Sequence, residues 1–166
     1  MTIVEYCTEE VDRQGHDPET LEGLKRVGWM CEAWSFAMYL KKQGTQIDRS
    51  VIEELGKMVE QEANAEGFRQ CGVRVGSYHA PHYLEVNHLI DEFCINGGVG
   101  LEPLPGTKTV DGEDGTFAFY RRFLEIHPFA DGNGRVGKIL LNWKNDTLQY
   151  PIFPPENFWG KPIRNP

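Results

Sequence analysis

Apolar residues recur at helical spacing through most of this chain, beginning in its second ten-residue block. The Asp17-Pro18 pair is typical of a helix start, with an N-cap followed by proline in the first turn. After it, apolar residues lie three or four positions apart at Leu24, Val27, Cys31, Trp34 and Met38. The pattern predicts a long helix that runs to about Lys42 and stops near Gly44.

A second helix is predicted from a capping box. Ser50 is followed three residues later by Glu53, the arrangement in which both side chains can bond backbone N–H groups at a helix start. One face of this helix is apolar and carries Ile52, Leu55 and Val59. The pattern dissolves near Gly67.

Residues 69–82 show a different period. Cys71, Val73 and Val75 alternate with Gly72, Arg74 and Gly76, which is the period-two pattern of a strand. The segment is short and rich in glycine, and it predicts a small β-hairpin ending at Ala80-Pro81. Helical spacing returns at Tyr83, Val86, Ile90 and Phe93 and stops at Asn96, and residues 97–115 are predicted to form a long loop.

Two further helices are predicted on either side of residues 127–135. Phe117, Tyr120 and Leu124 share a face with His127, so the first helix delivers this histidine at its C-terminal end. In the second helix the apolar face is formed by Val136, Ile139, Leu140 and Trp143. Arg135 and Lys138 lie three residues apart on another face, together with Asn142, so both cations can address one ligand.

The predicted fold class is therefore mostly α, in one domain, with a short β-hairpin. The 166 residues are enough for a hydrophobic core. We expect residues 1–16 to be a polar, loosely held segment, residues 17–146 to form the domain, and residues 147–166 to be a tail, rich in proline and aromatic residues, that packs on it.

Composition restricts the partners. The net charge of −8 argues against nucleic acid. No apolar stretch approaches the length needed to span a membrane, and the N-terminus lacks the pattern of a signal peptide. The four cysteines have no metal-type spacing, which favours reduced thiols. We therefore expect a cytoplasmic protein.

The chemistry of the chain is concentrated in His127-Pro128-Phe129-Ala130-Asp131-Gly132-Asn133-Gly134-Arg135. An imidazole can accept a proton near neutral pH, and a carboxylate can hold Mg²⁺. The small residues 132–134 leave backbone amides uncovered at a helix N-terminus, where phosphates bind readily. A guanidinium adds a fork of donors for phosphate. The stretch therefore predicts a nucleotide phosphate site.

This stretch resembles the signature of the Fic family, His-Pro-Phe-x-Asp/Glu-Gly-Asn-Gly-Arg-x-x-Arg. The match holds through Arg135 and departs at the last position, where Lys138 replaces the arginine. Helix order extends the resemblance to residues 20–145. The resemblance implies a compact Fic-type helical domain with a β-hairpin flap, and a protein adenylyltransferase that moves AMP from ATP to a protein hydroxyl.

The resemblance also implies a role for each residue of the site. His127 is the expected general base, and Asp131 is expected to hold Mg²⁺. The amides around Gly132, Asn133 and Gly134 are expected to bind phosphate, with the Asn133 side chain as a further donor. Arg135 is expected to bind the distal phosphates. Phe129 is expected to anchor the loop in the core.

Lys138 leaves two interpretations open. As a nucleotide-binding residue it keeps the charge of the arginine but loses the planar fork. As an ordinary helix residue it is simply solvated.

The resemblance implies one protein partner and leaves a second one open. The 69–82 hairpin resembles the Fic flap, on which a target protein docks as an added strand, while the alternative is a purely structural hairpin. Inhibitory helices in the family carry Ser/Thr-x-x-x-Glu-Gly/Asn. We interpret neither Ser50–Glu54 nor Thr109–Glu113 as one. Either the enzyme is unrestrained, or a separate inhibitory protein restrains it.

Two alternatives to AMP transfer remain at this point. The same scaffold could transfer another nucleotide, a phosphocholine or a phosphoryl group. The chain could also be a nucleotide-binding interaction module without catalysis, although a pure binder needs neither His127 nor Asp131.

Overall fold

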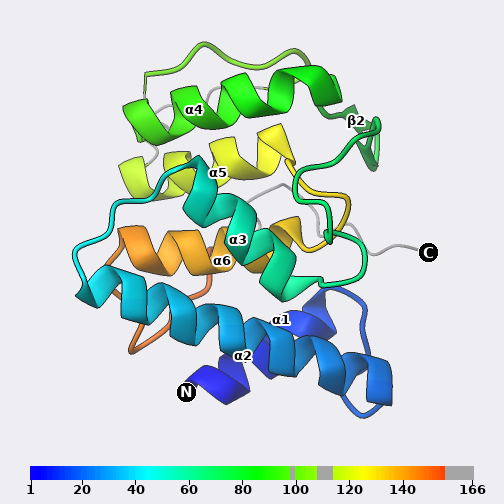
Figure 1. Cartoon of the computed structure of the whole chain (residues 1–166), viewed down its shortest axis with the longest axis vertical. Coiled ribbons are helices and arrows are strands. Elements are labelled where there is room, and N and C mark those ends of the chain that lie inside the picture. The colour runs from blue at the N-terminus through cyan, green and yellow to red at the C-terminus, as the bar shows by residue number, and fades with distance from the viewer. Residues whose placement is uncertain (98–99, 108–113, 156–166) are drawn as a thin grey trace.

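The structure is a computed structural model that describes residues 1–97, 100–107 and 114–155. These residues form helices, with one small hairpin among them (Figure 1). The elements are α1 (Ile3–Arg13), α2 (Leu21–Lys42), α3 (Arg49–Val59), β1 (Arg74–Val75), β2 (Tyr78–His79), the 3₁₀ turn η1 (Tyr83–Glu85), α4 (Val86–Asn96), α5 (Gly115–Ile126) and α6 (Asn133–Lys144). The prediction of a mostly α Fic-type fold with a short hairpin is confirmed.

The helix α6 lies at the centre of the domain. It packs against α5 on one side and against α2 and α3 on the others, and α4 covers the far side of α5 (Figure 1). Every residue from Arg135 to Trp143 is buried. Polar groups on such a helix must find partners inside the protein, because an unpaired buried polar group costs about 1–3 kcal/mol.

The N-terminal segment is not loosely held, and this expectation was wrong. Residues 3–13 form α1, which starts at a capping box between Thr2 and Glu5. Tyr6, Cys7 and Val11 are fully buried in the main core. The apolar side chains lie at helical spacing among many charged residues, which obscured the pattern.

Two predicted helix starts are displaced by a few residues. Thr20, rather than Asp17, caps α2, and its hydroxyl accepts the N–H of Gly23 at 3.1 Å. Asp48, rather than Ser50, caps α3, and its carboxylate accepts the N–H of Val51 at 2.8 Å. In both cases a residue that could serve as a cap lies close to the one that does, so the sequence pattern admits either. The helix α3 also ends at Val59, well before Gly67.

The remaining predicted elements are present. In the hairpin Arg74 is opposite His79, and Val75 is opposite Tyr78. The helix α4 ends on Gly97 in the left-handed conformation. Residues 147–155 lie against α1, α2 and α6, where the indole of Trp34 donates to the carbonyl of Leu148 and Phe153 stacks on Tyr6. Thr109 and Glu113, considered above as a partial inhibitory motif, lie outside the described residues, as do residues 156–166 of the tail.

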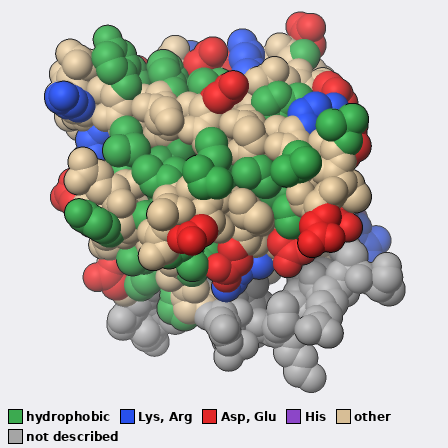
Figure 2. All heavy atoms as spheres, turned by 90° about the horizontal axis from the view of Figure 1, so that it is seen from below, with side chains coloured by type: hydrophobic (Ala, Val, Ile, Leu, Met, Phe, Trp, Pro, Cys, Tyr) green, Lys and Arg blue, Asp and Glu red, His purple; other side chains and the backbone are tan. Residues whose placement is uncertain are grey.

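The outer side of α1 and α2 leaves several large apolar side chains exposed, namely Val4, Leu21, Leu24 and Tyr39. Figure 2 views the molecule from this side and shows hydrophobic side chains in a band across the face, with carboxylates gathered along one edge. None of the helices in the described part of the chain is both long and apolar enough to cross a membrane.

Candidate functional site

The α5–α6 connection is a tight turn held by two residues with positive φ. His127 ends α5 with φ of 50°, and Gly132 begins α6 with φ of 78°. At Gly132 a side chain would also be excluded by space, since a Cβ atom would lie 2.9 Å from a methyl carbon of Val59. The turn and the hairpin lie at the same end of the helices (Figure 1).

His127 is arranged to accept a proton. Its Nδ1 atom lies 3.2 Å from the carbonyl oxygen of Leu124, which can only accept a hydrogen bond. The neutral ring therefore carries its proton on Nδ1, and the lone pair is on Nε2. Burial lowers the pKa of His127 below the ordinary histidine value. The ring is consequently neutral near pH 7 and available as a base.

The first turn of α6 offers free backbone donors. Within the part of the chain that the structure describes, no group accepts from the N–H groups of Asn133, Gly134 or Arg135. These N–H groups lie at the positive end of the helix dipole, which favours an anion. The side chain of Gln14, from the end of α1, lies over this turn, because a Cβ atom on Gly134 would be 2.6 Å from its amide nitrogen.

The side chain of Asn133 has a different role from the one expected. Its Oδ1 atom accepts the N–H of Phe129 at 2.9 Å, and its Nδ2 atom donates to the carbonyl of the same residue at 2.9 Å. Asn133 is also buried. It therefore shapes the turn through the Phe129 backbone, and its main-chain N–H is the group that faces a possible anion.

Phe129 anchors the turn in the core, as predicted. Its ring is fully buried, with its centroid 5.2 Å from that of Phe68. It lies so close to α3 that a Cβ atom on Gly56 would be 2.1 Å from ring carbons. The packing of the Phe129 ring against Gly56 of α3 thus fixes the turn.

Asp131 has one occupied oxygen and one open oxygen. Its Oδ1 atom accepts the N–H of Gly132 at 2.6 Å and lies 3.5 Å from a guanidinium nitrogen of Arg135. None of the described residues bonds to Oδ2, and the side chain is 46% exposed. Such a carboxylate suits Mg²⁺, which commonly takes one or two protein carboxylates and completes its shell with phosphate and water.

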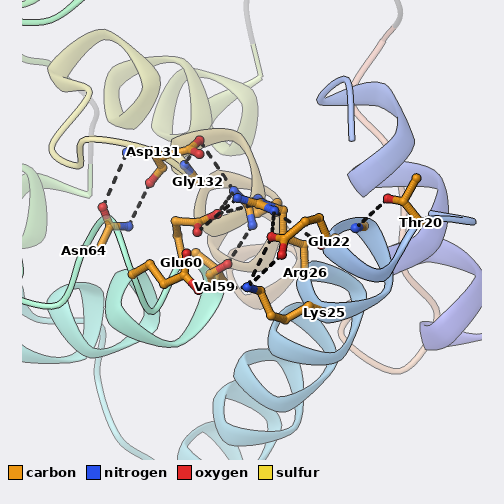
Figure 3. Close-up of polar contacts among 12 residues, drawn as sticks. Thr20, Glu22, Lys25, Arg26, Val59, Glu60, Asn64, Asp131 and Gly132 are labelled. Atoms are coloured by element: carbon orange, nitrogen blue, oxygen red, sulfur yellow. Dashed lines mark hydrogen bonds and ion pairs between the residues drawn. The ribbon is translucent and has the colours of Figure 1, made fainter. Parts of the chain in front are cut away.

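Arg135 is fully buried, and its charge is balanced within the protein. Its Nη1 atom donates to the carbonyl of Val59 at 2.6 Å, and its Nη2 atom pairs with Oε2 of Glu60 at 2.9 Å. The same carboxylate pairs with Arg26 of α2 at 3.0 Å (Figure 3). Among the described residues, no group accepts a hydrogen bond from Nε of the guanidinium.

Asn64, in the turns after α3, holds the same connection (Figure 3). Its side-chain amide donates to the carbonyl of Asp131 at 2.8 Å and to the carbonyl of Gly56 at 3.0 Å. Its Oδ1 atom accepts the N–H of Asp131 at 3.4 Å. The end of α3 therefore fixes both Asp131 and Arg135.

Lys138 is not a solvated helix residue. It is buried, and its ammonium group lies 3.1 Å from Oε1 of Glu10 in α1 and 5.4 Å from the centre of the Tyr120 ring. Burial alone would lower the pKa of Lys138, but Glu10 and Tyr120 outweigh it and raise the pKa above the usual lysine value. Lys138 and Arg135 thus have different partners, on α1 and α3 respectively.

The motif residues were predicted from the sequence, whereas their partners were not. Glu10, Glu60 and Asn64 come from distant segments and match no motif. The same is true of Arg69, whose Nε atom donates to the carbonyl of His127 at 2.7 Å. A signal for α1 did exist in the Thr2–Glu5 capping box. No comparable signal marks the other three residues.

The site occupies a region that resembles known proteins. The family model described as Fic/DOC family matches residues 42–144. A probable protein adenylyltransferase from Aquifex aeolicus (strain VF5) is 54% identical over 39 residues, a stretch that covers 24% of this chain and 12% of that relative.

Proposed function

The chain belongs to the Fic/DOC family, and we propose that it transfers AMP from ATP to a serine, threonine or tyrosine hydroxyl of another protein. The observation that carries the proposal is the combination of His127 and the start of α6. A neutral imidazole lies at one end of the turn, and the backbone N–H groups of residues 133–135 lie at the other. Within the described residues, neither Nε2 of the imidazole nor these N–H groups have a partner. The name of the Aquifex relative is in keeping with a nucleotidyl transfer.

In the proposed reaction the target hydroxyl oxygen attacks the α-phosphorus of ATP. Its proton passes to Nε2 of His127, and the bond from this phosphorus to the oxygen that bridges to the β-phosphate breaks. Pyrophosphate leaves, and AMP remains on the target. A positioned base of this kind contributes about 10²–10⁴-fold to a rate.

The N–H groups of residues 133–135 would stabilise the negative charge that develops on phosphate oxygens. One well-placed donor of this type is worth about 3–4 kcal/mol in the transition state. Asp131 would hold Mg²⁺ through its open oxygen, and the bound ion would neutralise charge on the α- and β-phosphates. The carboxamide of Gln14 lies beside this turn, 2.6 Å from where a Cβ atom of Gly134 would be, so it would border the bound phosphate.

The two cations of α6 would act differently. Arg135 is fully buried, so it could address the distal phosphates through Nε only after its surroundings had moved to uncover this atom. Lys138 could reach the nucleotide only after leaving Glu10. A target segment would dock along the edge of the 69–82 hairpin as an added strand.

Intact-mass analysis after incubation with ATP and Mg²⁺ tests the proposal. A gain of about 329 Da on a lysate protein, or on the chain itself, marks AMP, whereas about 80 Da marks a phosphoryl group. No gain in mass would favour a binding module. His127→Ala should lose transfer and keep its affinity for ATP, and exposed His88 of α4 offers the matched control His88→Ala. If His127→Ala kept more than about a tenth of wild-type transfer, His127 would not be the base.

A further inference from the structure

Arg69 lies directly before the hairpin, and its guanidinium is buried among carbonyl oxygens. The residue is only 4% exposed. Its Nε atom donates to the carbonyl oxygen of His127 at 2.7 Å, and Nη1 donates to that of Cys71 at 2.9 Å. Its Nη2 atom donates to the carbonyl oxygens of Pro81 at 2.6 Å and Ile126 at 3.4 Å. None of the described residues forms an ion pair with it, so this cation is stabilised by carbonyl dipoles alone.

These four carbonyls belong to two groups. Ile126 and His127 end α5, where the helix dipole places partial negative charge and where a cation is favourable. Cys71 and Pro81 are the two ends of the hairpin, before β1 and after β2. The backbone N–H of Arg69 adds a third bond to the turn, at 3.0 Å to the carbonyl of Pro128. One residue thus bonds three successive carbonyls of the turn and both ends of the hairpin.

The backbone of residues 126–128 needs hydrogen-bond donors from outside α5, and Arg69 supplies them. His127 has a left-handed backbone conformation, which is uncommon for a residue with a side chain and must be held by its surroundings. The carbonyls of residues 126–128 fall where α5 stops, so they require donors from elsewhere. Tyr78, in β2, adds another bond between the hairpin and α5 through its hydroxyl, at 2.7 Å to the carbonyl of Glu125.

We infer that Arg69 is a positioning residue that joins the 69–82 hairpin and the His127 turn into one rigid unit. This inference rests on the proposed function, since it assumes that the hairpin holds the target and that His127 takes the proton. A target segment paired with the hairpin would then present its hydroxyl at a fixed distance from Nε2 of His127. Arg69 itself touches neither the nucleotide nor the hydroxyl.

The test compares Arg69→Lys with Arg122→Lys. Lysine keeps the charge but cannot reach four carbonyls. Arg122 is a matched control because it is also buried and also donates to a carbonyl, that of Glu102 at 2.9 Å, which belongs neither to the turn nor to the hairpin. Amide hydrogen exchange of the chain without nucleotide is followed at Ala80 in the hairpin, at His127, and at Ile139 in α6.

In Arg69→Lys, exchange at Ala80 and at His127 should accelerate together, by at least about tenfold, while exchange at Ile139 stays as in Arg122→Lys. Exchange that rises at one of the two sites only, or equally at all three, overturns the inference. If Arg69→Lys does not fold, Tyr78→Phe provides the second test. It removes the hairpin's bond to Glu125, and it should accelerate exchange at the same two sites to a smaller degree.

Transfer supplies the second measurement, with labelled ATP and lysate proteins as acceptors. Arg69→Lys should lower the maximal rate by at least about tenfold and leave the KM for ATP within about twofold, because the nucleotide lies at the start of α6. Equal rates in Arg69→Lys and Arg122→Lys overturn the inference. If the wild-type chain transfers nothing, the proposed function fails, and the exchange measurement alone decides whether Arg69 joins the hairpin to the turn.

Discussion

Replacing Gly56 by alanine tests how the His127 turn is anchored. In α3 the Cα atom of Gly56 faces the ring of Phe129, and an added methyl group would lie 2.1 Å from two ring carbons. Carbon atoms prefer separations of about 3.5–4.0 Å, so the ring would have to shift by roughly 1.5 Å. The ring is fully buried and lies beside Phe68, so it has little room to move.

The magnitude follows from two opposing terms. Alanine is favoured over glycine inside a helix by about 1 kcal/mol, whereas overpacking a core costs typically about 1–3 kcal/mol. Gly28 of α2 provides the control, because no atom lies within 4 Å of a Cβ atom built there. Gly28→Ala should therefore raise the free energy of unfolding. The free energy of unfolding of Gly56→Ala should be lower than that of Gly28→Ala by the overpacking cost, about 1–3 kcal/mol.

Urea denaturation of both variants measures this difference, and a double-mutant cycle assigns it. Phe129→Leu replaces the ring with a smaller side chain. It should therefore relieve part of the destabilisation caused by Gly56→Ala, with a coupling energy of about 1 kcal/mol or more. Transfer should also slow in Gly56→Ala, because Phe129 is two residues from His127. If both glycine variants gain equal stability, or if the cycle shows no coupling, then Phe129 does not anchor the turn against α3.

The remaining predictions concern charged groups of the site. Because burial lowers the pKa of His127, the transfer rate should hold as the pH falls through about 6.5 and decline only below it; an acid limb at or above that pH contradicts a buried base. Because the pKa of His127 is lower in the folded state than in the unfolded state, the free energy of unfolding should fall as the pH drops from about 6.5 towards the folded-state pKa. Denaturation at several pH values measures this loss. Asp131→Asn should weaken Mg²⁺-ATP binding in calorimetry by at least about tenfold and change binding of ATP without the metal much less. Glu10→Gln should lower the free energy of unfolding by about 3–5 kcal/mol, because it leaves the Lys138 cation buried without the carboxylate that pairs with it. Adding Lys138→Met should recover much of that loss, and no recovery would mean that Glu10 acts through something other than this pair.

Helices with an unbroken apolar period were predicted correctly from the sequence. A helix whose apolar period is interrupted by charged residues was missed. The chain from Tyr83 to Asn96 and the helix α6 were located correctly, because their apolar spacing agrees with a glycine at one end, Gly97 after α4 and Gly132 before α6. By contrast, α1 carries Ile3, Tyr6, Cys7 and Val11 among charged residues, and it was mistaken for a loose segment. One of those charges is Glu10, whose burial makes sense only once Lys138 is seen beside it. A buried ion pair 128 residues apart leaves no local pattern.

The same distinction holds for the site, where the chemistry is local and the geometry is not. Residues 127–135 carry the proposed base, a carboxylate and the N–H groups that have no partner among the described residues, so one stretch of sequence predicts what the site could do. The position of each group is set from elsewhere, by Asn64 and Glu60 after α3 and by Arg69 before the hairpin. These residues bond main-chain carbonyls or a buried arginine. Many residue types can make such bonds, so the sequence alone does not mark the residues that make them here. The motif is therefore sufficient to propose a reaction, and three distant side chains determine whether its atoms are held where that reaction needs them.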